Sequence, residues 1–561
     1  MNDQPNLRQF LDEVSSFSEE EQAAAGKSAS APLAPIGKVL EIAGSSSKIC
    51  MDSKQLGAFQ SHSDPSVAMS GQVGSQVKMV VGDNWLIANV RTMRADVSGE
   101  ILANVDFLGE GSRDSSGKMS NFRRGVTRYP IPGADVHAVT TDDLRAVFAA
   151  SDEAHVEIGT VYPTEDIRGA LYVDPMLSKH FAILGSTGTG KSTAVALILH
   201  RISELSPEGH ILMVDPHGEY SAAFKGCGEI FNVDNLQLPY WLMNFDEHCE
   251  VLLTTHDAER QRDADILAKC LLAARTKGKD LSQLGKVTVD SPIPYLLTDL
   301  NTILVNEMGK LERAGDTLPY QRLKTKLDEL RVDPRYTYMF SGMLVSDSLG
   351  SLLAKLFRLP SQGRPISIVD VSGVPSEITS VVVSVLARMV FDYAIWSRTE
   401  AQKPLLLVCE EAHRYVPKDE HQEGGQAVRR ILERIAKEGR KYGVSLGLIT
   451  QRPSDLAEGV LSQCGTIIAM RLNNDRDQAC VRAAMPEGAR GFLDAIPALR
   501  NRECIVCGEG VAIPIRVRFD DLEPEKRPAS SDPSFSRLWR ETGDEAGIIS
   551  RTVKRWRGHG R

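Results

Sequence analysis

The sequence predicts an α/β protein with a helical insertion and a small antiparallel β-barrel near its N-terminus. Three observations predict it. Residues 34–150 contain short Val- and Ile-rich runs between Gly, Ser, Asp and Asn, which is typical of strands joined by tight turns. From residue 151 onward, apolar strands alternate with amphipathic helices, as in a parallel sheet. Residues 246–347 interrupt this alternation with stretches rich in Ala, Leu, Lys, Arg and Glu, which favour helices.

The composition is that of a folded globular protein. The chain has 561 residues, enough for roughly two to four domains. Hydrophobic residues make up 42% and charged residues 25%, which excludes a collagen-like, membrane-embedded or wholly disordered chain. The formal net charge is −9, so a nucleic acid would have to meet a local positive surface such as a channel.

The cysteines and the apolar runs indicate the cellular compartment in which the protein resides. Nine cysteines without disulfide spacing indicate reducing conditions. Cys504 and Cys507 form one CxxC, which we interpret as two strand cysteines, the alternative being a metal or redox site. The first thirty residues lack the apolar segment of a signal peptide, and no uncharged apolar run reaches about 18 residues. We therefore expect a cytoplasmic protein with no membrane partner.

Composition shifts divide the chain into parts. The first stretch combines a short amphipathic pattern with an Ala- and Ser-rich run, which indicates a helix followed by a flexible arm. The last stretch is polar and ends in basic residues. The expected parts are a flexible arm with a short helix (1–33), the β-barrel (34–150), the α/β core (151–245 and 348–520), the helical insertion (246–347) and a C-terminal tail (521–561).

Within the core, each expected strand is a short apolar run and each expected helix is a longer amphipathic one. Helices are expected at 193–205, 376–396 and 426–443. Strands are expected at 180–185, 210–215, 366–373, 405–410, 444–450, 466–472, 503–510 and 511–519.

The strongest functional signal lies between the first of these strands and the first helix. It fills every fixed place of the pattern GxxxxGK[ST] in the context that this pattern requires. Backbone N–H groups of such a loop surround nucleotide phosphates, Lys191 reaches the β and γ phosphates, and the Ser192 hydroxyl binds Mg²⁺. The predicted ligands are therefore ATP and Mg²⁺. The candidate nucleotide-binding residues are Gly185, Ser186, Thr187, Gly188, Thr189, Gly190, Lys191, Ser192 and Thr193.

Two adjacent acids end the strand at 405–410. We assign Glu410 to the Mg²⁺ shell through water, and Glu411 to the general base that polarises the attacking water. The alternative is a pair of solvated acids at a helix cap. Asp215 is a rival acidic strand end, expected beside the site, with a metal role left open.

A hydrolase also has to sense the γ-phosphate. Gln451 follows the strand at 444–450, at the edge where such sheets bind ligands, and is the expected sensor. Arg440 is the candidate arginine finger that reaches a neighbouring subunit's nucleotide. Other basic residues are expected on a solvated helix face or, in the last strand, at a subunit interface: Arg429, Arg430, Arg434, Arg516 and Arg518.

Six segments in a fixed order resemble the HerA family of hexameric DNA translocases, relatives of the FtsK-type motors. They are GSTGTGKST, VDPHGEY, LPYWLMNFDE, VDVSGVPSE, VCEEAHRYVP and EGRKYGVSLGLITQRPS, and the resemblance extends from about Ile158 to Arg518. It implies a RecA-like core with a helical insertion, an N-terminal barrel, and a homo-hexamer with ATP sites between subunits and double-stranded DNA in its central channel.

The resemblance also implies roles and partners. It maps Lys191 and Ser192 to phosphate and Mg²⁺, Glu411 to the catalytic acid, Gln451 to the sensor and Arg440 to the finger acting in trans. Many P-loop ATPases have Asp where this chain has Glu410, so we expect water-mediated metal contact. A partner nuclease or sirtuin-like effector is expected to dock near the barrel, in DNA end processing or phage defence.

Two further readings remain open: an ATP-regulated scaffold ring that activates a partner without translocating, and a secretion-coupling ATPase. The basic residues of the tail, which contact phosphates, brace a neighbouring subunit or belong to a frayed terminus, are Arg551, Lys554, Arg555, Arg557 and Arg561.

Overall fold

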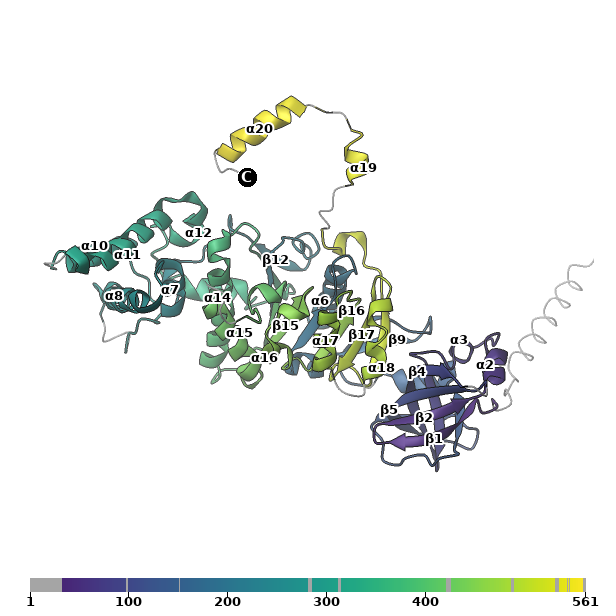
Figure 1. The fold of residues 1–561 in the computed structure, drawn as a ribbon. Coiled ribbons are helices and arrows are strands. Elements are labelled where there is room, and N and C mark those ends of the chain that lie inside the picture. The colour runs from purple at the N-terminus through teal and green to yellow at the C-terminus, as the bar shows by residue number, and fades with distance from the viewer. Residues whose placement is uncertain are drawn as a thin grey trace, which may run out of the picture. The chain divides into compact units, whose positions relative to one another are not determined.

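The computed structural model places most of the chain in two compact units (Figure 1). One unit comprises residues 1–189 with 464–520, and the other comprises residues 190–463 with 521–561. The arm and short helix expected over residues 1–33 fall outside the described residues, apart from Leu33. The structure describes residues 33–96, 99–150, 152–280, 285–310, 314–419, 425–485, 489–529, 534–541, 543 and 545–557.

The N-terminal part of the first unit is a closed antiparallel barrel, as predicted. Its strands follow the order β2-β1-β7-β3-β4-β5, and pairing of β2 with β5 closes the ring, while β6 extends β5 on its other side. Val39, Ile49, Val77 and Val105 are among the fully buried side chains of its core. The elements are β1 (Gly37–Ala43), β2 (Ser46–Met51), α2 (Ser53–Phe59), α3 (Pro65–Ala68), β3 (Gln76–Val81), β4 (Asn84–Ala95), β5 (Ile101–Arg113), β6 (Met119–Arg124), β7 (Asp135–Ala138) and α4 (Thr141–Phe148).

The same unit carries a second set of paired strands. Their order is β10-β16-β17-β18-β8-β9, in which only β10 and β16 are parallel. Cys504 and Cys507 are fully buried on β17, and the described residues hold no cluster of three or more His, Cys, Asp or Glu side chains suited to a metal. The elements are β8 (His155–Val161), β9 (Arg168–Tyr172), α5 (Val173–Ser178), β10 (Phe181–Leu184), β16 (Thr466–Met470), α17 (Asp475–Ala484), α18 (Arg490–Leu493), β17 (Glu503–Gly508) and β18 (Ile515–Phe519).

The second unit contains the parallel sheet that the sequence predicts. Its strands follow the order β12-β13-β11-β14-β15. All of them except the edge strand β12 are nearly continuous runs of buried residues, as expected of parallel strands covered on both faces. The elements are α6 (Lys191–Leu205), β11 (Ile211–Asp215), β12 (Gly228–Phe231), α13 (Leu349–Leu356), β13 (Ile366–Asp370), α14 (Ser376–Trp396), β14 (Leu405–Cys409), α15 (Gln426–Glu438), β15 (Val444–Thr450) and α16 (Glu458–Leu461).

Among the described helices, α14 alone is long and apolar enough to cross a membrane, judged by length and composition. The helix is not an uncharged run, because it contains Arg388 and Asp392. Of its most apolar stretch, 67% is buried inside the protein. This is the burial expected of a core helix.

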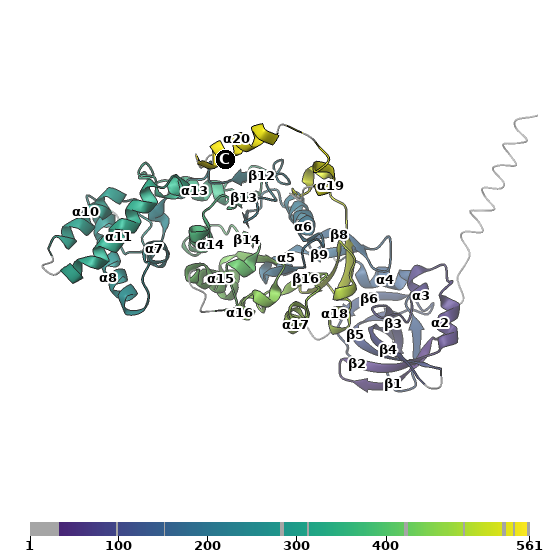
Figure 2. The same cartoon turned by 45° about the horizontal axis from the view of Figure 1, so that its top comes forward.

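The range expected for the helical insertion contains several packed helices. Figure 2 shows α8, α10 and α11 side by side, and each contacts the other two. Buried leucines such as Leu267, Leu300, Leu304 and Leu327 fill the space between them. The elements are α7 (Phe245–Leu252), α8 (Asp257–Thr276), α10 (Leu297–Met308), α11 (Ala314–Val332) and α12 (Thr337–Phe340).

Buried polar groups attach the insertion to the sheet-covering helices. The guanidinium of Arg388 on α14 pairs with the Glu247 carboxylate on α7 at 2.9 Å. Arg275, which is fully buried, donates hydrogen bonds to the carbonyl oxygens of Trp241 and Met243. Because buried charges are tolerated only when they are paired or fully hydrogen-bonded, these contacts hold α7, α8 and α14 in one arrangement.

His248 lies in the same network and is held neutral. Its Nδ1 donates to the Asn244 carbonyl oxygen (2.7 Å), so Nε2 is left to accept the hydrogen bond of the Tyr295 hydroxyl (2.9 Å). Burial, together with the positive charges of Arg275 and Arg388, lowers the pKa of His248 to about 3. Protonation would place a third cation in this site.

Acid should therefore destabilise the protein through His248. The neutral ring contributes its full stability above about pH 6.5, and this contribution is lost as the pH falls toward 3. At about 1.4 kcal/mol per pKa unit, the loss amounts to roughly 2–3 kcal/mol at pH 4.5. In His248→Gln the acceptor for Tyr295 remains but does not titrate. Urea unfolding of both full-length chains at pH 7 and 4.5 gives their free energies of unfolding. The difference in favour of the wild type should shrink by that amount at pH 4.5, and a difference that does not change with pH would contradict this.

Candidate nucleotide-binding site

Parallel register brings the acidic strand ends of the second unit to one edge of its sheet. Asp215 ends β11 opposite Asp370 at the end of β13, and Val214 lies opposite Cys409 at the end of β14. Glu410 and Glu411 follow directly after β14, and Gln451 follows β15. The carboxyl ends of parallel strands are where such sheets bind ligands.

The glycine-rich loop connects β10 to α6. Gly188 and Gly190 have φ values of 77° and 91°, a conformation that other residues adopt only with strain. The boundary between the two units falls between Thr189 and Gly190. On its first side, the Thr189 hydroxyl donates to the Ser186 carbonyl oxygen (2.8 Å). On its second side, Lys191, Ser192 and Thr193 form the first turn of α6, where N–H groups lack helical partners and favour anions.

The structure brings Lys191 and Glu411 together. The Lys191 ammonium lies 3.3 Å from Glu411 Oε1, and both side chains are buried. On its other side, His413 Nδ1 lies 3.2 Å from Glu411 Oε2 and 3.0 Å from the Thr450 hydroxyl. Burial alone would raise the pKa of Glu411, but the His413 hydrogen bond and the Lys191 charge lower it to about 2. Glu411 is therefore a carboxylate, as a general base must be.

Glu411 is held in an unusual backbone conformation. Its φ of 50° and ψ of 45° lie in the left-handed region, although it is not a glycine. Such a conformation costs about 1–3 kcal/mol and persists where the surrounding contacts impose it. The turn points the carboxylate toward Lys191 instead of continuing β14.

Glu410 has the opposite electrostatic environment. The Tyr220 hydroxyl donates to its Oε1 (2.9 Å), while Oε2 is buried and has no hydrogen-bond partner among the described residues. Burial and the nearby Asp215 charge raise the pKa of Glu410 to about 8. Adjacent carboxyl groups with pKa values pushed apart are suited to different tasks.

The loop 216–220 after β11 supplies contacts that the sequence analysis did not assign. The Asp215 carboxylate accepts hydrogen bonds from the backbone N–H groups of His217, Gly218 and Tyr220, so it shapes this loop. The Ser192 hydroxyl donates to Glu219 Oε2 (3.0 Å). Two of these residues, Glu219 and Tyr220, lie in the HGEY segment, and His413 lies in the EEAH segment. These family-like segments were the sequence evidence that could have pointed to them.

Arg440 lies apart from the other candidate residues. It is exposed in the 3₁₀ turn Gly439–Tyr442, which precedes β15, whereas Gln451 follows that strand. The Leu405 N–H at the start of β14 donates to the Gly443 carbonyl oxygen, which places this turn at the opposite edge of the sheet from Glu411. β14 has 5 residues, and at roughly 3.3 Å per residue the two edges are roughly 15 Å apart.

The other basic candidates have partners within the chain. Arg429, expected on a solvated face, is buried and pairs with Glu433 (2.9 Å). Arg430 pairs with Asp246 (2.8 Å), and the Arg434 guanidinium lies over the Phe391 ring. Arg516 pairs with Glu503 (2.7 Å) and covers the Tyr162 ring, so it is engaged within its own unit, and Arg518 is exposed. Arg440 makes no ion pair with any described residue.

Comparison with known proteins shows a likeness to HerA helicases. The family model of the HerA helicase central domain matches residues 156–390. The "DNA double-strand break repair helicase HerA" of Pyrococcus furiosus is 25% identical over 85% of this chain and 89% of its own length. The HerA of Sulfolobus acidocaldarius is 26% identical over 76% of this chain and 80% of its own. Most of this chain therefore resembles the HerA helicases, and residues 156–390 match their central domain. It is accordingly a P-loop ATPase.

Solved structures also resemble this chain. VirB4 of Thermoanaerobacter pseudethanolicus is 16% identical with a TM-score of 0.48, covering 67% of this chain and 99% of that one. The bacterial conjugative coupling protein TrwB is 14% identical with a TM-score of 0.46, covering 71% of this chain and 95% of that one.

Replacing Glu411, the predicted general base, should separate ATP binding from hydrolysis. Glu411→Gln keeps a hydrogen-bond acceptor near Lys191 but removes the base, so hydrolysis should fall about 10²–10⁴-fold while ATP stays bound. Lys191→Ala should instead lose both binding and turnover. Glu458→Gln, an exposed acid paired with Lys418, is the matched control and should hydrolyse at the wild-type rate. Rates by phosphate release and binding by equilibrium dialysis check this; unchanged hydrolysis in Glu411→Gln would refute the assignment.

Proposed function

We propose that this chain hydrolyses ATP to translocate on double-stranded DNA as a homo-hexameric ring, and that the ring couples to a partner nuclease or another effector. The observation that supports this most is that the candidate catalytic residues lie at two opposite edges of one sheet. Lys191 and Glu411 meet at one edge, while exposed Arg440 lies at the other. A neighbouring copy can then supply the missing cation, as arginine fingers do in P-loop enzymes. The names of the archaeal relatives, DNA repair helicases, support DNA as the track.

The residues around Ser192 fit a magnesium ion. The Ser192 hydroxyl and the unpartnered Glu410 Oε2 are oxygen donors, the type that Mg²⁺ prefers. No group of three or more acidic, His or Cys side chains suited to a metal occurs among the described residues, so phosphate and water oxygens would complete the shell. Bound Mg²⁺ would neutralise charge on the phosphate oxygens. A cation would also favour the charged form of Glu410, whose pKa burial raises.

The side chains then have separate tasks in hydrolysis. Lys191 turns from Glu411 to the β and γ phosphates, which attract the ammonium more strongly than one carboxylate does. Glu411 stays charged and accepts a proton from the attacking water, while His413, whose Nδ1 also contacts the Thr450 hydroxyl, lies beside the carboxylate. Gln451, at the end of the adjacent strand, is the proposed γ-phosphate sensor.

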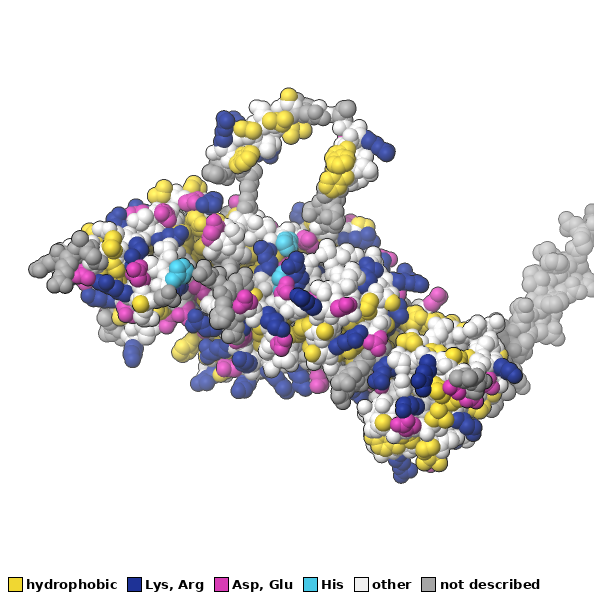
Figure 3. Space-filling model, viewed as in Figure 1, with side chains coloured by type: hydrophobic (Ala, Val, Ile, Leu, Met, Phe, Trp, Pro, Cys, Tyr) yellow, Lys and Arg dark blue, Asp and Glu magenta, His cyan; other side chains and the backbone are white. Residues whose placement is uncertain are grey.

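The remaining parts of the chain provide the DNA and effector contacts in this proposal. Figure 3 shows Lys and Arg side chains gathered around α15, whose exposed basic residues are Arg430, Arg434 and Lys437. Local positive surfaces of this kind would allow DNA binding despite a net charge of −9. We assign effector docking to the barrel (34–150) and place the motor in the cytoplasm, without a membrane partner, in DNA end processing or phage defence.

Linear duplex DNA should raise ATP turnover severalfold. Translocation couples each hydrolysis cycle to contact with the track, so turnover without DNA should be slow. Phosphate release by the purified chain is measured with and without a linear duplex, and light scattering in the same buffer should show six chains per particle. Lys191→Ala should form the same particle without turnover. ATP turnover that is the same with and without DNA, or that appears only when a partner protein is added, would instead favour the ATP-regulated scaffold ring.

Two inactive variants should restore each other if Arg440 acts in trans. A site needs Lys191 from one chain and Arg440 from its neighbour, so Arg440→Ala and Lys191→Ala chains are each inactive alone. In rings mixed at random in equal amounts, about a quarter of the sites would contain both residues and regain turnover. Lys441→Ala, the exposed neighbouring position, should keep full activity. No recovery at any ratio, in rings shown by labelling to have mixed, would contradict trans action.

A further inference from the structure

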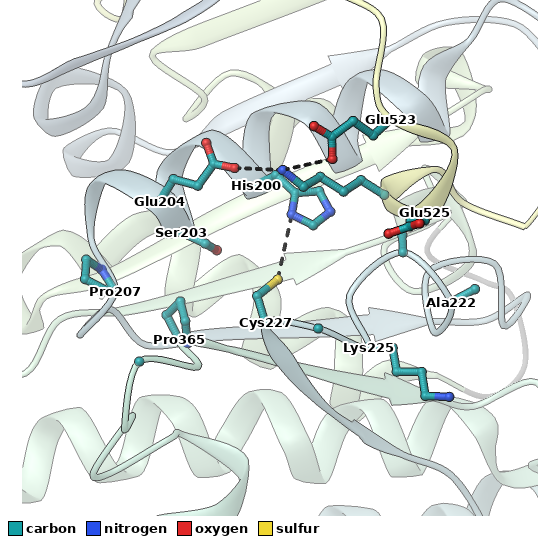
Figure 4. Close-up of a pocket in the computed structure, with 14 residues that line it drawn as sticks. His200, Ser203, Glu204, Pro207, Ala222, Lys225, Cys227, Pro365, Glu523 and Glu525 are labelled. Carbon is teal, nitrogen blue, oxygen red and sulfur yellow. Dashed lines mark hydrogen bonds and ion pairs between the residues drawn. The ribbon is translucent and has the colours of Figure 1, made fainter.

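A segment far along the chain reaches back to the nucleotide site. Residues 521–529, here the C-terminal strap, run alongside α6, the helix that begins with Lys191 and Ser192. The Lys526 ammonium lies 3.2 Å from Glu204 of α6 and 3.6 Å from Glu523 of the strap (Figure 4). Between the strap and α6 lies a pocket of about 640 Å³ lined by His200, Cys227 and other residues. The strap is thus held over a hollow by a few polar contacts.

One backbone hydrogen bond links the strap to the loop 216–220. The Ala529 N–H donates to the Glu219 carbonyl oxygen (2.8 Å). The loop itself is rigid, since the Asp215 carboxylate accepts three of its N–H groups. Gly218 has a φ of +68° and lies so close to Asp370 that a Cβ would be 3.0 Å from that carboxylate. A change at Ala529 therefore acts on a loop with little freedom to adjust elsewhere.

The side chain of Glu219 acts on Ser192. It accepts the hydrogen bond of the Ser192 hydroxyl at 3.0 Å. A serine hydroxyl has one proton and two lone pairs, so a fixed acceptor for the proton also fixes the direction of the lone pairs. A lone pair of the Ser192 oxygen can then face a cation. The adjacent Tyr220 hydroxyl meanwhile holds Glu410, the other expected metal ligand.

We propose that Glu219 is a positioning residue for the Mg²⁺ ligand Ser192, and that the C-terminal strap, through the Ala529 N–H, sets the Mg²⁺ affinity of the nucleotide site. This inference rests on the proposed Mg²⁺-dependent ATPase function. The series is continuous within one unit: strap backbone, Glu219 carbonyl, Glu219 carboxylate, Ser192 hydroxyl. A segment outside the sheet thereby gains control over the chemical step.

The test measures Mg²⁺ affinity directly on the full-length chain. Binding of a fluorescent ADP analogue is titrated with Mg²⁺ and repeated in EDTA. Glu219→Ala should raise the half-saturating Mg²⁺ concentration about 10–100-fold, the usual effect of removing a residue that supports a metal ligand. Glu219→Gln, which keeps an acceptor for the Ser192 hydroxyl, should restore most of the affinity. Binding of the analogue in EDTA should be the same in all three proteins.

The strap is tested by one hydrogen bond. Ala529→Pro removes the N–H that Glu219 accepts and should raise the half-saturating Mg²⁺ concentration a few-fold, because proline has no N–H. Ala529→Gly keeps the donor and should match the wild type. Thermal unfolding without nucleotide should be alike in both, which separates positioning from folding.

Each outcome of these titrations decides the proposal. The role of Glu219 would be overturned if Glu219→Ala and the wild type had the same Mg²⁺ affinity. It would also be overturned if Glu219→Ala bound the ADP analogue more weakly than the wild type by the same factor in EDTA as with Mg²⁺. A normal Ala529→Pro beside a weakened Glu219→Ala would overturn the role of the strap. If the wild type bound the analogue without any Mg²⁺ dependence, the magnesium site in the proposed function would fail, and this inference with it.

Discussion

The parallel pairing of β11, β13, β14 and β15 is the constraint on which the rest of the site depends. In an antiparallel sheet the residues after successive strands would alternate between the two edges, and Asp215, Glu410 and Gln451 would not meet. Because the strands run in one direction and in register, their carboxyl ends lie together next to the first turn of α6. Hydrophobic burial of the strands is thus what places these three polar side chains at one edge of the sheet.

Electrostatics then separates two neighbours that are chemically identical. Glu410 and Glu411 are adjacent, yet the left-handed turn at Glu411 sends its carboxylate to Lys191 and His413, while Glu410 remains in a buried position near Asp215. One acid therefore stays charged and the other is held partly neutral until a cation arrives. Backbone strain at Glu411 is the cost of this separation, and it persists because the surrounding contacts impose the turn.

The sequence predicted the fold class, the barrel and the family, and the structure and comparisons confirm them. Hydrophobic periodicity and the order of the motifs carry that information. Pairwise contacts such as Glu219 with Ser192 or Tyr220 with Glu410 were not predictable in the same way, because they depend on how loop 216–220 folds around Asp215. The burial of Arg429 was missed for a related reason: helical periodicity identifies a face but not what covers it.

The separation of Arg440 from Lys191 limits how copies of this chain can associate. A two-fold dimer joins identical patches, so it completes both sites only where the Lys191 edge and the Arg440 edge lie in one patch. The proposed head-to-tail contact brings one chain's Arg440 edge to the next chain's Lys191 edge, and such contacts continue until rotation closes a ring. In the proposed ring, the last subunit to join would complete two sites at once, its own and that of its neighbour, so closure of the ring would activate the final pair.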